Sequence, residues 1–90
     1  FGHAGDGNIH VNFVVDRDDE AAVARARKCV SETFKLSVEL GGTISGEHGI
    51  GYVKAPYLGY AVDDATLAVM KGIKQTFDPN GILNPGKMFV

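Results

Sequence analysis

Apolar and polar residues alternate along residues 8–15 of this 90-residue chain. A period of two residues predicts a β-strand with one apolar face and one polar face. We expect the apolar face to pack on a helix and the polar face, which carries His10 and Asn12, to look into a functional site. The apolar positions are Ile9, Val11, Phe13 and Val15.

The next segment has the period of an amphipathic helix over residues 19–40. Asp16 or Asp18 is expected to cap its first turn, and the glycines at 41–42 are expected to end it. Cys29 flanks the apolar stripe and is interpreted as a small core residue. The stripe itself consists of Val23, Ala26, Val30, Phe34 and Val38.

A second helix is predicted over residues 64–77, with Asp63 as its N-terminal cap and a turn over 78–81 at its end. Its expected buried stripe is Leu67, Met70, Ile73 and Phe77. The other segments are predicted to be a loop over 43–53, one helical turn within 54–60 and an extended tail over 82–90. The sequence therefore predicts one main strand and two main helices.

Composition excludes several classes of protein. The formal net charge is −2 without a basic stripe, so we expect no nucleic-acid partner. The single cysteine cannot form an internal disulfide, which favours a reducing compartment and a cytoplasmic location. No apolar run approaches the ~18 residues of a membrane span. Ninety residues make at most one small domain. Because the chain begins with Phe1, directly before its first motif, we expect a fragment of a longer protein.

Candidate chemistry is concentrated in three glycine-rich segments, residues 2–10, 45–51 and 84–87, which contain all three histidines. Glycine makes up 12 of the 90 residues, more than its usual share of ~7% of a protein sequence. Most of these glycines lie in the three segments. The excess is therefore local and indicates close backbone approach or positive φ angles. Two imidazoles and a carboxylate among tight turns are what a divalent metal site with a catalytic base requires.

His3 and His10 are seven residues apart, which is not the spacing of two ligands on one helix face. A tight turn over residues 4–7 would bring His3 beside the strand that carries His10. The pair alone is a weak metal signal, and two surface or core histidines are the alternative. Asp6 could be a ligand, but between two glycines it is better interpreted as a turn former.

Glu47 and His48 are neighbours between two glycines. Adjacent side chains diverge in extended structure, so we expect the two to have different roles. Glu47 can complete a triad with His3 and His10 that suits zinc, manganese or iron. His48 is then free as a general base, because histidine titrates near neutral pH. A solvated glutamate and a structural histidine remain the alternative, as does a simple turn with a solvated lysine for residues 84–87.

Three motifs in order give the chain a family resemblance. They are Gly-His-x-Gly-Asp-Gly-Asn-x-His-x-Asn from residue 2, Ser-Gly-Glu-His-Gly-x-Gly from residue 45, and Phe-Asp-Pro-x-Gly-x-Leu-Asn-Pro-Gly-Lys from residue 77. Together they resemble the C-terminal part of the FAD-linked oxidases of the vanillyl-alcohol oxidase superfamily. The most similar members are of the glycolate oxidase D subunit, D-lactate dehydrogenase and D-2-hydroxyglutarate dehydrogenase type.

The resemblance implies a fold and a set of site residues. Residues 1–90 would be a C-terminal fragment of a ferredoxin-like cap domain of α+β class, with the N-terminal FAD-binding domain absent. The arginine that family members usually place on the substrate carboxylate is also missing. The implied roles are metal binding for His3, His10 and Glu47, general base for His48, contact with substrate and flavin for Asn12, and contact with the flavin for Asn84 and Lys87.

The implied activity is FAD-dependent oxidation of a D-2-hydroxy acid of glycolate or D-lactate type to the 2-oxo acid. It would be metal-assisted, with proton removal by His48 and hydride transfer to the flavin. Implied partners are the 2-hydroxy acid, the FAD domain and electron-transfer subunits.

Two alternatives remain: a metal-dependent hydrolase that uses the same triad, and a non-catalytic cap or interaction module. By itself the 90-residue chain is expected to be inactive and to form homo-oligomers, because its single predicted strand has no partner.

Overall fold

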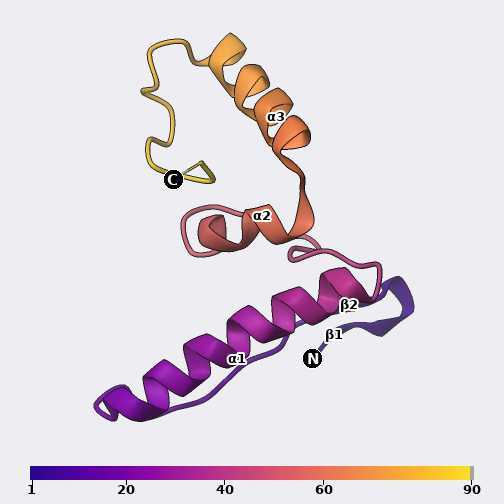
Figure 1. Ribbon diagram of the computed structural model, residues 1–90, viewed down its shortest axis with the longest axis vertical. Helices are drawn as coiled ribbons and strands as arrows, with labels where there is room; N and C mark the ends of the chain where they lie inside the picture. The colour runs from indigo at the N-terminus through magenta and orange to yellow at the C-terminus, as the bar shows by residue number, and fades with distance from the viewer. Residues whose placement is uncertain (90) are drawn as a thin grey trace. The chain divides into compact units, whose positions relative to one another are not determined.

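The computed structural model describes residues 1–89, which divide into two compact units, one over Phe1–His48 and one from Gly49 onward. The elements are β1 (Gly2–His3), η1 (Ala4–Asp6), β2 (Asn8–Ile9), α1 (Glu20–Glu39), η2 (Ala55–Tyr57), α2 (Leu58–Ala61) and α3 (Asp64–Phe77) (Figure 1). A small antiparallel sheet together with helices confirms the α+β class. None of the helices in the described residues is long and apolar enough to cross a membrane.

The first unit opens with the hairpin β1–η1–β2. Gly2 lies opposite Ile9 and His3 lies opposite Asn8 in an antiparallel pair. The connection is closed by Gly7, whose φ of 71° is left-handed and whose N–H donates to the Ala4 carbonyl at 3.1 Å. The tight turn predicted over residues 4–7 is therefore confirmed.

The predicted strand over residues 8–15 is wrong in its extent, because β2 ends at Ile9. A strand needs the backbone groups of a neighbour, and the partner β1 has only two residues. The predicted apolar face is absent in its first half, where Ile9 and Val11 are 69% and 54% exposed, and is retained only in its second half. Phe13 and Val15 are 40% and 42% exposed, whereas Val14 between them is 95% exposed.

Helix α1 begins one residue later than predicted, and its cap is Asp19 rather than Asp16 or Asp18. The Asp19 side chain accepts a hydrogen bond from the Ala22 N–H at 3.0 Å. Asp16 instead accepts from the Asp18 N–H at 3.0 Å and forms the turn that leads into the helix. Several acidic residues stand in a row here, and only the one three positions before the receiving N–H satisfies the geometry of a cap.

The C-terminal end of α1 is the predicted glycine cap. Gly41 has a φ of 89° and donates to the Val38 carbonyl, while Gly42 donates to the Ser37 carbonyl, which is a Schellman arrangement. All five residues of the predicted stripe are half-buried. Cys29 is exposed, so its interpretation as a core residue is wrong, because it lies beside the stripe and not within it.

Helix α1 returns the chain to the hairpin. The ten residues after β2 can span at most about 33 Å at ~3.3 Å per residue, and a 20-residue helix covers about 30 Å at ~1.5 Å per residue. The two lengths are comparable, so the helix can run back along the segment and end near the hairpin. Figure 1 shows β1 and β2 at the C-terminal end of α1. The loop after α1 therefore lies close to His3 in β1 and to His10, the residue after β2.

The second unit contains η2, α2 and α3. The predicted helical turn within 54–60 is present and continues to Ala61, with Ala55 and Leu58 buried. Helix α3 has the predicted bounds, and Asp63 caps it by accepting from the Thr66 N–H at 2.7 Å. The predicted stripe is half-buried only in its first half, at Leu67 and Met70. Ile73 and Phe77 are 55% and 80% exposed, because no element within residues 49–89 covers that part of α3.

The predicted turn over residues 78–81 is confirmed by a 3.1 Å hydrogen bond from the Gly81 N–H to the Asp78 carbonyl. The extended tail predicted over residues 82–90 is wrong for residues 82–89, and Val90 lies outside the described residues. Asn84, Gly86 and Met88 all have left-handed φ angles, and the Met88 N–H donates to the Gly51 carbonyl at 2.5 Å. The Asn-Pro-Gly sequence is itself a turn former, which explains why the chain folds back here.

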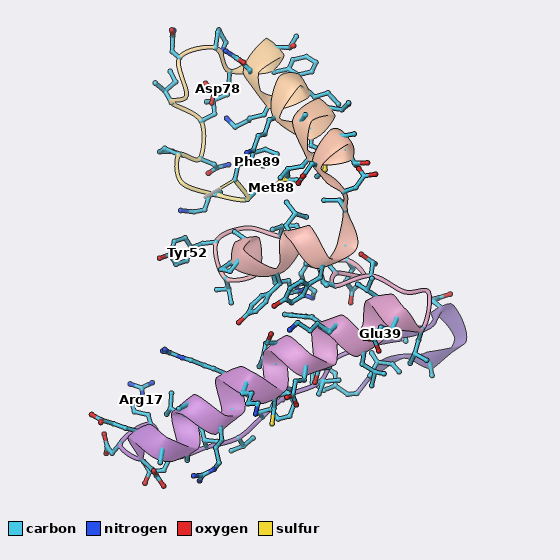
Figure 2. All side chains as sticks on the ribbon, in the orientation of Figure 1. Arg17, Glu39, Tyr52, Asp78, Met88 and Phe89 are labelled. Carbon is cyan, nitrogen blue, oxygen red and sulfur yellow. The ribbon has the colours of Figure 1, made fainter. Side chains whose placement is uncertain are left out.

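Asp78 is the buried acidic residue of the described chain and organises this turn. Its carboxylate accepts hydrogen bonds from the Lys74 ammonium and from the backbone N–H groups of Ile82 and Leu83, both at 3.0 Å. Lys74 also donates to the Leu83 carbonyl at 2.9 Å. Figure 2 shows Asp78 between the end of α3 and the segment that follows it. The Lys74 ammonium, aided by the two backbone bonds, lowers the pKa of Asp78 from its ordinary value of 3.8, against the opposing effect of burial.

We expect Asp78→Asn to speed hydrogen exchange at the Ile82 and Leu83 amides about tenfold at pH 7, because an amide cannot accept all three bonds. The contribution of Asp78 is present above its ordinary pKa of 3.8 and is lost as the pH falls through the lowered value. The difference between wild type and variant should therefore shrink below pH 3.8. Exchange mass spectrometry of the full-length protein measures both effects. Asp64→Asn removes the same charge from an exposed position of α3 and serves as the control.

Candidate functional site

Three histidines surround one oxygen of Glu47. The distances from Glu47 Oε1 to the Nε2 atoms of His10, His3 and His48 are 3.1, 3.9 and 3.9 Å. All four residues were predicted from the sequence, and the first unit brings all four together. Glu47 is the common neighbour, since the three imidazoles each approach the same carboxylate oxygen.

The hairpin positions the two N-terminal histidines. His3 and Asn8 form a cross-strand pair, so their side chains share one face of the two-stranded ribbon. His10 follows two residues after Asn8, which returns it to the same face. Its N–H donates to the Phe1 carbonyl at 2.6 Å, and the Phe1 ring stacks on the imidazole at 4.7 Å between centroids with 1° between the planes. The stack and the backbone bond together fix the plane of the His10 ring.

The loop after α1 positions Glu47 and His48. Ile44 is 5% exposed and anchors the loop, and Gly46 then passes close to Asn8. Gly49 has a φ of 76°, a left-handed conformation that glycine adopts without strain. The loop bends over residues 46–48 instead of running extended. The expectation that the Glu47 and His48 side chains diverge is therefore wrong, since the bend leaves His48 Nε2 only 3.9 Å from Glu47 Oε1.

The imidazole of His48 also meets that of His10. The two rings make an edge-to-face contact, with centroids 5.4 Å apart and an interplanar angle of 88°. Exposure differs widely within the group: the side chains of His10, Glu47, His3 and His48 are 27%, 44%, 64% and 71% exposed. The most accessible imidazole is that of His48, so a small molecule can reach it from solvent.

Hydrogen bonds lower the pKa of the Glu47 carboxyl from its ordinary value of 4.5. The bond with His10 has the largest effect and a side-chain bond with Asn8 the next, against a smaller opposing effect of burial; the charge of His48 adds to the lowering. The carboxylate is therefore ionised at neutral pH. An ionised carboxylate beside imidazole nitrogens is both a metal ligand and a group that stabilises a protonated histidine.

The donor set fits a divalent ion. One ligand atom each from His10, Glu47 and His48 lies within 4.8 Å of the other two. Imidazole nitrogen with carboxylate oxygen suits zinc, manganese or iron. This grouping contains two members of the predicted triad and adds His48, while His3 stands 3.9 Å from the same Glu47 oxygen. The assignment of His3, His10 and Glu47 as ligands, with His48 as base, remains a prediction.

The other predicted site residues lie elsewhere in the chain. Asn12 is exposed in the extended segment between β2 and α1. Asn84 and Lys87 belong to the second unit. Asn84 adopts a left-handed φ of 46°, and the Lys87 ammonium stands 5.8 Å from the centroid of the Tyr52 ring, a cation–π contact. Tyr52 is labelled in Figure 2.

Sequence reasoning missed three residues. Phe1 stacks on His10, Asn8 contacts Glu47 and Gly46, and Asp78 organises the turn after α3. A signal was present for two of them. Asn8 stands on the polar face of the predicted strand with His10, and Asp78 directly follows a helix and precedes a proline. Nothing in the sequence alone could show that Phe1 faces His10.

Comparison with known proteins identifies the family. The model of the family "FAD linked oxidases, C-terminal domain" matches residues 1–88 of the chain. The chain belongs to this family. The resemblance in the three glycine-rich motifs is thereby confirmed, and with it the assignment of these residues to the C-terminal domain of such enzymes.

Individual proteins similar to this chain have names consistent with this family. The chain is 48% identical over 89 residues to glycolate oxidase subunit GlcD of Bacillus subtilis, which covers 99% of this chain and 19% of that protein. It is 43% identical over 90 residues to D-lactate dehydrogenase of Anaerostipes hadrus, with coverages of 98% and 19%. It is 45% identical over 94 residues to D-2-hydroxyglutarate dehydrogenase of Stutzerimonas stutzeri, with coverages of 99% and 20%. The chain thus spans at most 20% of the length of these relatives.

Proposed function

We propose that this chain is the C-terminal part of an FAD-dependent oxidoreductase that oxidises a D-2-hydroxy acid, of glycolate or D-lactate type, to the 2-oxo acid. The family and the names of its relatives support the reaction class. The observation that carries the proposal for the chain itself is the group of three imidazoles around Glu47 Oε1. Such a group can bind a substrate through a metal and accept its proton.

His3, His10 and Glu47 hold a divalent ion in this proposal. When bound, the ion supplies Lewis acidity, which makes a coordinated substrate hydroxyl easier to deprotonate. Glu47 is ionised, since its pKa is lowered by His10 and Asn8, so it is ready to act as a ligand at neutral pH. The Phe1 stack holds the His10 ring in one orientation, which reduces the ordering cost of binding.

His48 is the proton acceptor. It is the most exposed of the three imidazoles, at 71%, so a substrate hydroxyl can reach it. Its Nε2 stands 3.9 Å from Glu47 Oε1, and the ionised carboxylate stabilises the imidazolium that forms when the proton arrives. Asn12 is proposed to contact the substrate and flavin, and Asn84 and Lys87 to contact the flavin. The flavin, when bound by the rest of the protein, supplies the acceptor for the hydride.

The test is anaerobic reduction of the full-length protein. Purified protein should contain FAD and about one divalent ion per chain, and D-lactate or glycolate should bleach the flavin absorbance. The matched control is L-lactate, which has the same functional groups in the opposite configuration and should reduce the flavin more slowly. Full-length protein without FAD but with metal-dependent hydrolytic activity would instead identify a hydrolase. Protein without FAD, metal or turnover would identify a non-catalytic module.

A further inference from the structure

Gly46 has a steric reason to be glycine. A Cβ atom on Gly46 would lie 2.4 Å from Oδ1 of Asn8, 2.8 Å from its Cγ and 3.4 Å from its Nδ2, and these are its three nearest neighbours. The φ angle of Gly46 is outside the left-handed region, so alanine could adopt this backbone conformation. Gly49 is the opposite case, with a φ of 76° and no atom within 4 Å of the position that a Cβ would take. Gly46 therefore provides space for Asn8, whereas Gly49 provides conformational freedom.

Asn8 uses that space to reach Glu47. It lies in β2 opposite His3, is half-buried, and its side chain lies against Gly46, the residue before Glu47. Hydrogen bonding by this side chain lowers the pKa of the Glu47 carboxyl. Because a carboxylate only accepts, the Asn8 amide is the donor. The other groups close to this carboxylate are His3, His10 and His48, each of which is a candidate ligand or base. Asn8 is thus a neighbour of Glu47 that is itself neither a candidate ligand nor a candidate base.

We propose that Asn8 is a positioning residue that orients the Glu47 carboxylate toward the histidines, and that Gly46 lacks a side chain in order to admit it. This inference rests on the proposed function, in which Glu47 is a metal ligand. A hydrogen bond to a ligating carboxylate fixes its orientation, and loss of such a partner typically weakens metal binding about 10–100-fold. One contact thereby links two glycine-rich motifs that are separated by α1.

The test is zinc affinity of the full-length, FAD-containing protein, measured by chelator competition. Asn8→Ala should weaken zinc binding about 10–100-fold, with FAD content and unfolding temperature close to wild type. Gly46→Ala should also weaken zinc binding, because the new methyl displaces Asn8. In the Asn8→Ala background the same Gly46→Ala change should have little further effect, since the obstructing side chain is gone. Gly49→Ala is the matched control. Its effect on zinc affinity should be the same in the wild-type and Asn8→Ala backgrounds, because it arises from the left-handed φ that alanine would have to adopt at this position.

Additive effects of Asn8→Ala and Gly46→Ala would overturn the proposal, as would unchanged zinc affinity in Asn8→Ala. If Asn8→Ala does not fold, Asn8→Ser is used, which is smaller than asparagine and should likewise make Gly46→Ala harmless. A wild-type protein that binds no zinc would refute the metal site of the proposed function itself. Wild-type binding that Asn8→Ala leaves intact would refute only the role of Asn8.

Discussion

Replacing His48 with asparagine in the full-length, FAD-containing protein is expected to lower kcat about 10²–10⁴-fold, the usual contribution of a general base. Asparagine is polar and similar in reach, but it cannot accept a proton at neutral pH. The ionised Glu47 carboxylate, 3.9 Å from the imidazole, is the group that stabilises the protonated histidine, and this partnership is lost in the variant. FAD content and metal content should stay at wild-type values.

Turnover with D-lactate and metal content by mass spectrometry decide the role of His48. The structure makes both readouts necessary, because His48 lies within the same 4.8 Å group as His10 and Glu47. Lower turnover with metal retained supports the role of base, whereas loss of metal would make His48 a ligand. An unchanged rate of turnover would exclude both the role of base and the role of ligand for His48. Asp6→Asn is a suitable control, since Asp6 is an exposed acidic residue in the hairpin turn and not in this group.

Local structure was predictable wherever a few neighbouring residues determine it. The cap at Asp63 and the glycine end of α1 depend on hydrogen bonds that span at most five residues, so the sequence shows them directly. The hairpin turn over residues 4–7 belongs to the same class. The cap of α1 was misplaced by one to three residues because four acidic residues in this region compete for one position.

Structure that depends on distant partners was predicted less well. The alternation predicted for residues 8–15 is seen in the exposures of residues 13–15 alone, and the length of the strand is set by the two-residue partner β1. Ile73 and Phe77 follow the helical stripe and are nevertheless exposed, because periodicity shows which face is apolar and not what covers it. The extended tail is a wrong prediction of another kind, since the Asn-Pro-Gly sequence within it already favours a turn.

In the candidate site, too, the part that depends on local sequence was predicted and the part that depends on distant partners was not. Residue chemistry was enough to select His3, His10, Glu47 and His48, although Glu47 is 37 residues from His10. It was not enough to show that three imidazoles share one carboxylate oxygen, because that geometry follows from the matched lengths of the extended segment and α1. The contact between Asn8 and Gly46 has the same origin.

Glu47→Gln is expected to have the largest effect on metal binding. Glutamine keeps the shape of the side chain and removes the charge that all three histidines face. Because Glu47 is a proposed ligand and not an outer partner, its loss should weaken metal affinity by more than the about 10–100-fold typical of an outer partner. Titration of the metal-depleted full-length protein with zinc measures the change. His10→Ala should have a comparable effect, since His10 Nε2 is the imidazole nitrogen closest to Glu47, at 3.1 Å.

The control for charge is Glu39→Gln, which removes an equal charge at the exposed C-terminal end of α1, where Figure 2 labels it. That variant should bind zinc as wild type does, because Glu39 is not in the group of ligand atoms. Wild-type affinity in Glu47→Gln would show that the histidines bind without the carboxylate. Glu47 would then serve the imidazolium of His48 alone, and the variant should lower turnover without releasing metal. Zinc affinity and kcat measured on the same protein therefore separate the two roles that one carboxylate oxygen can have here.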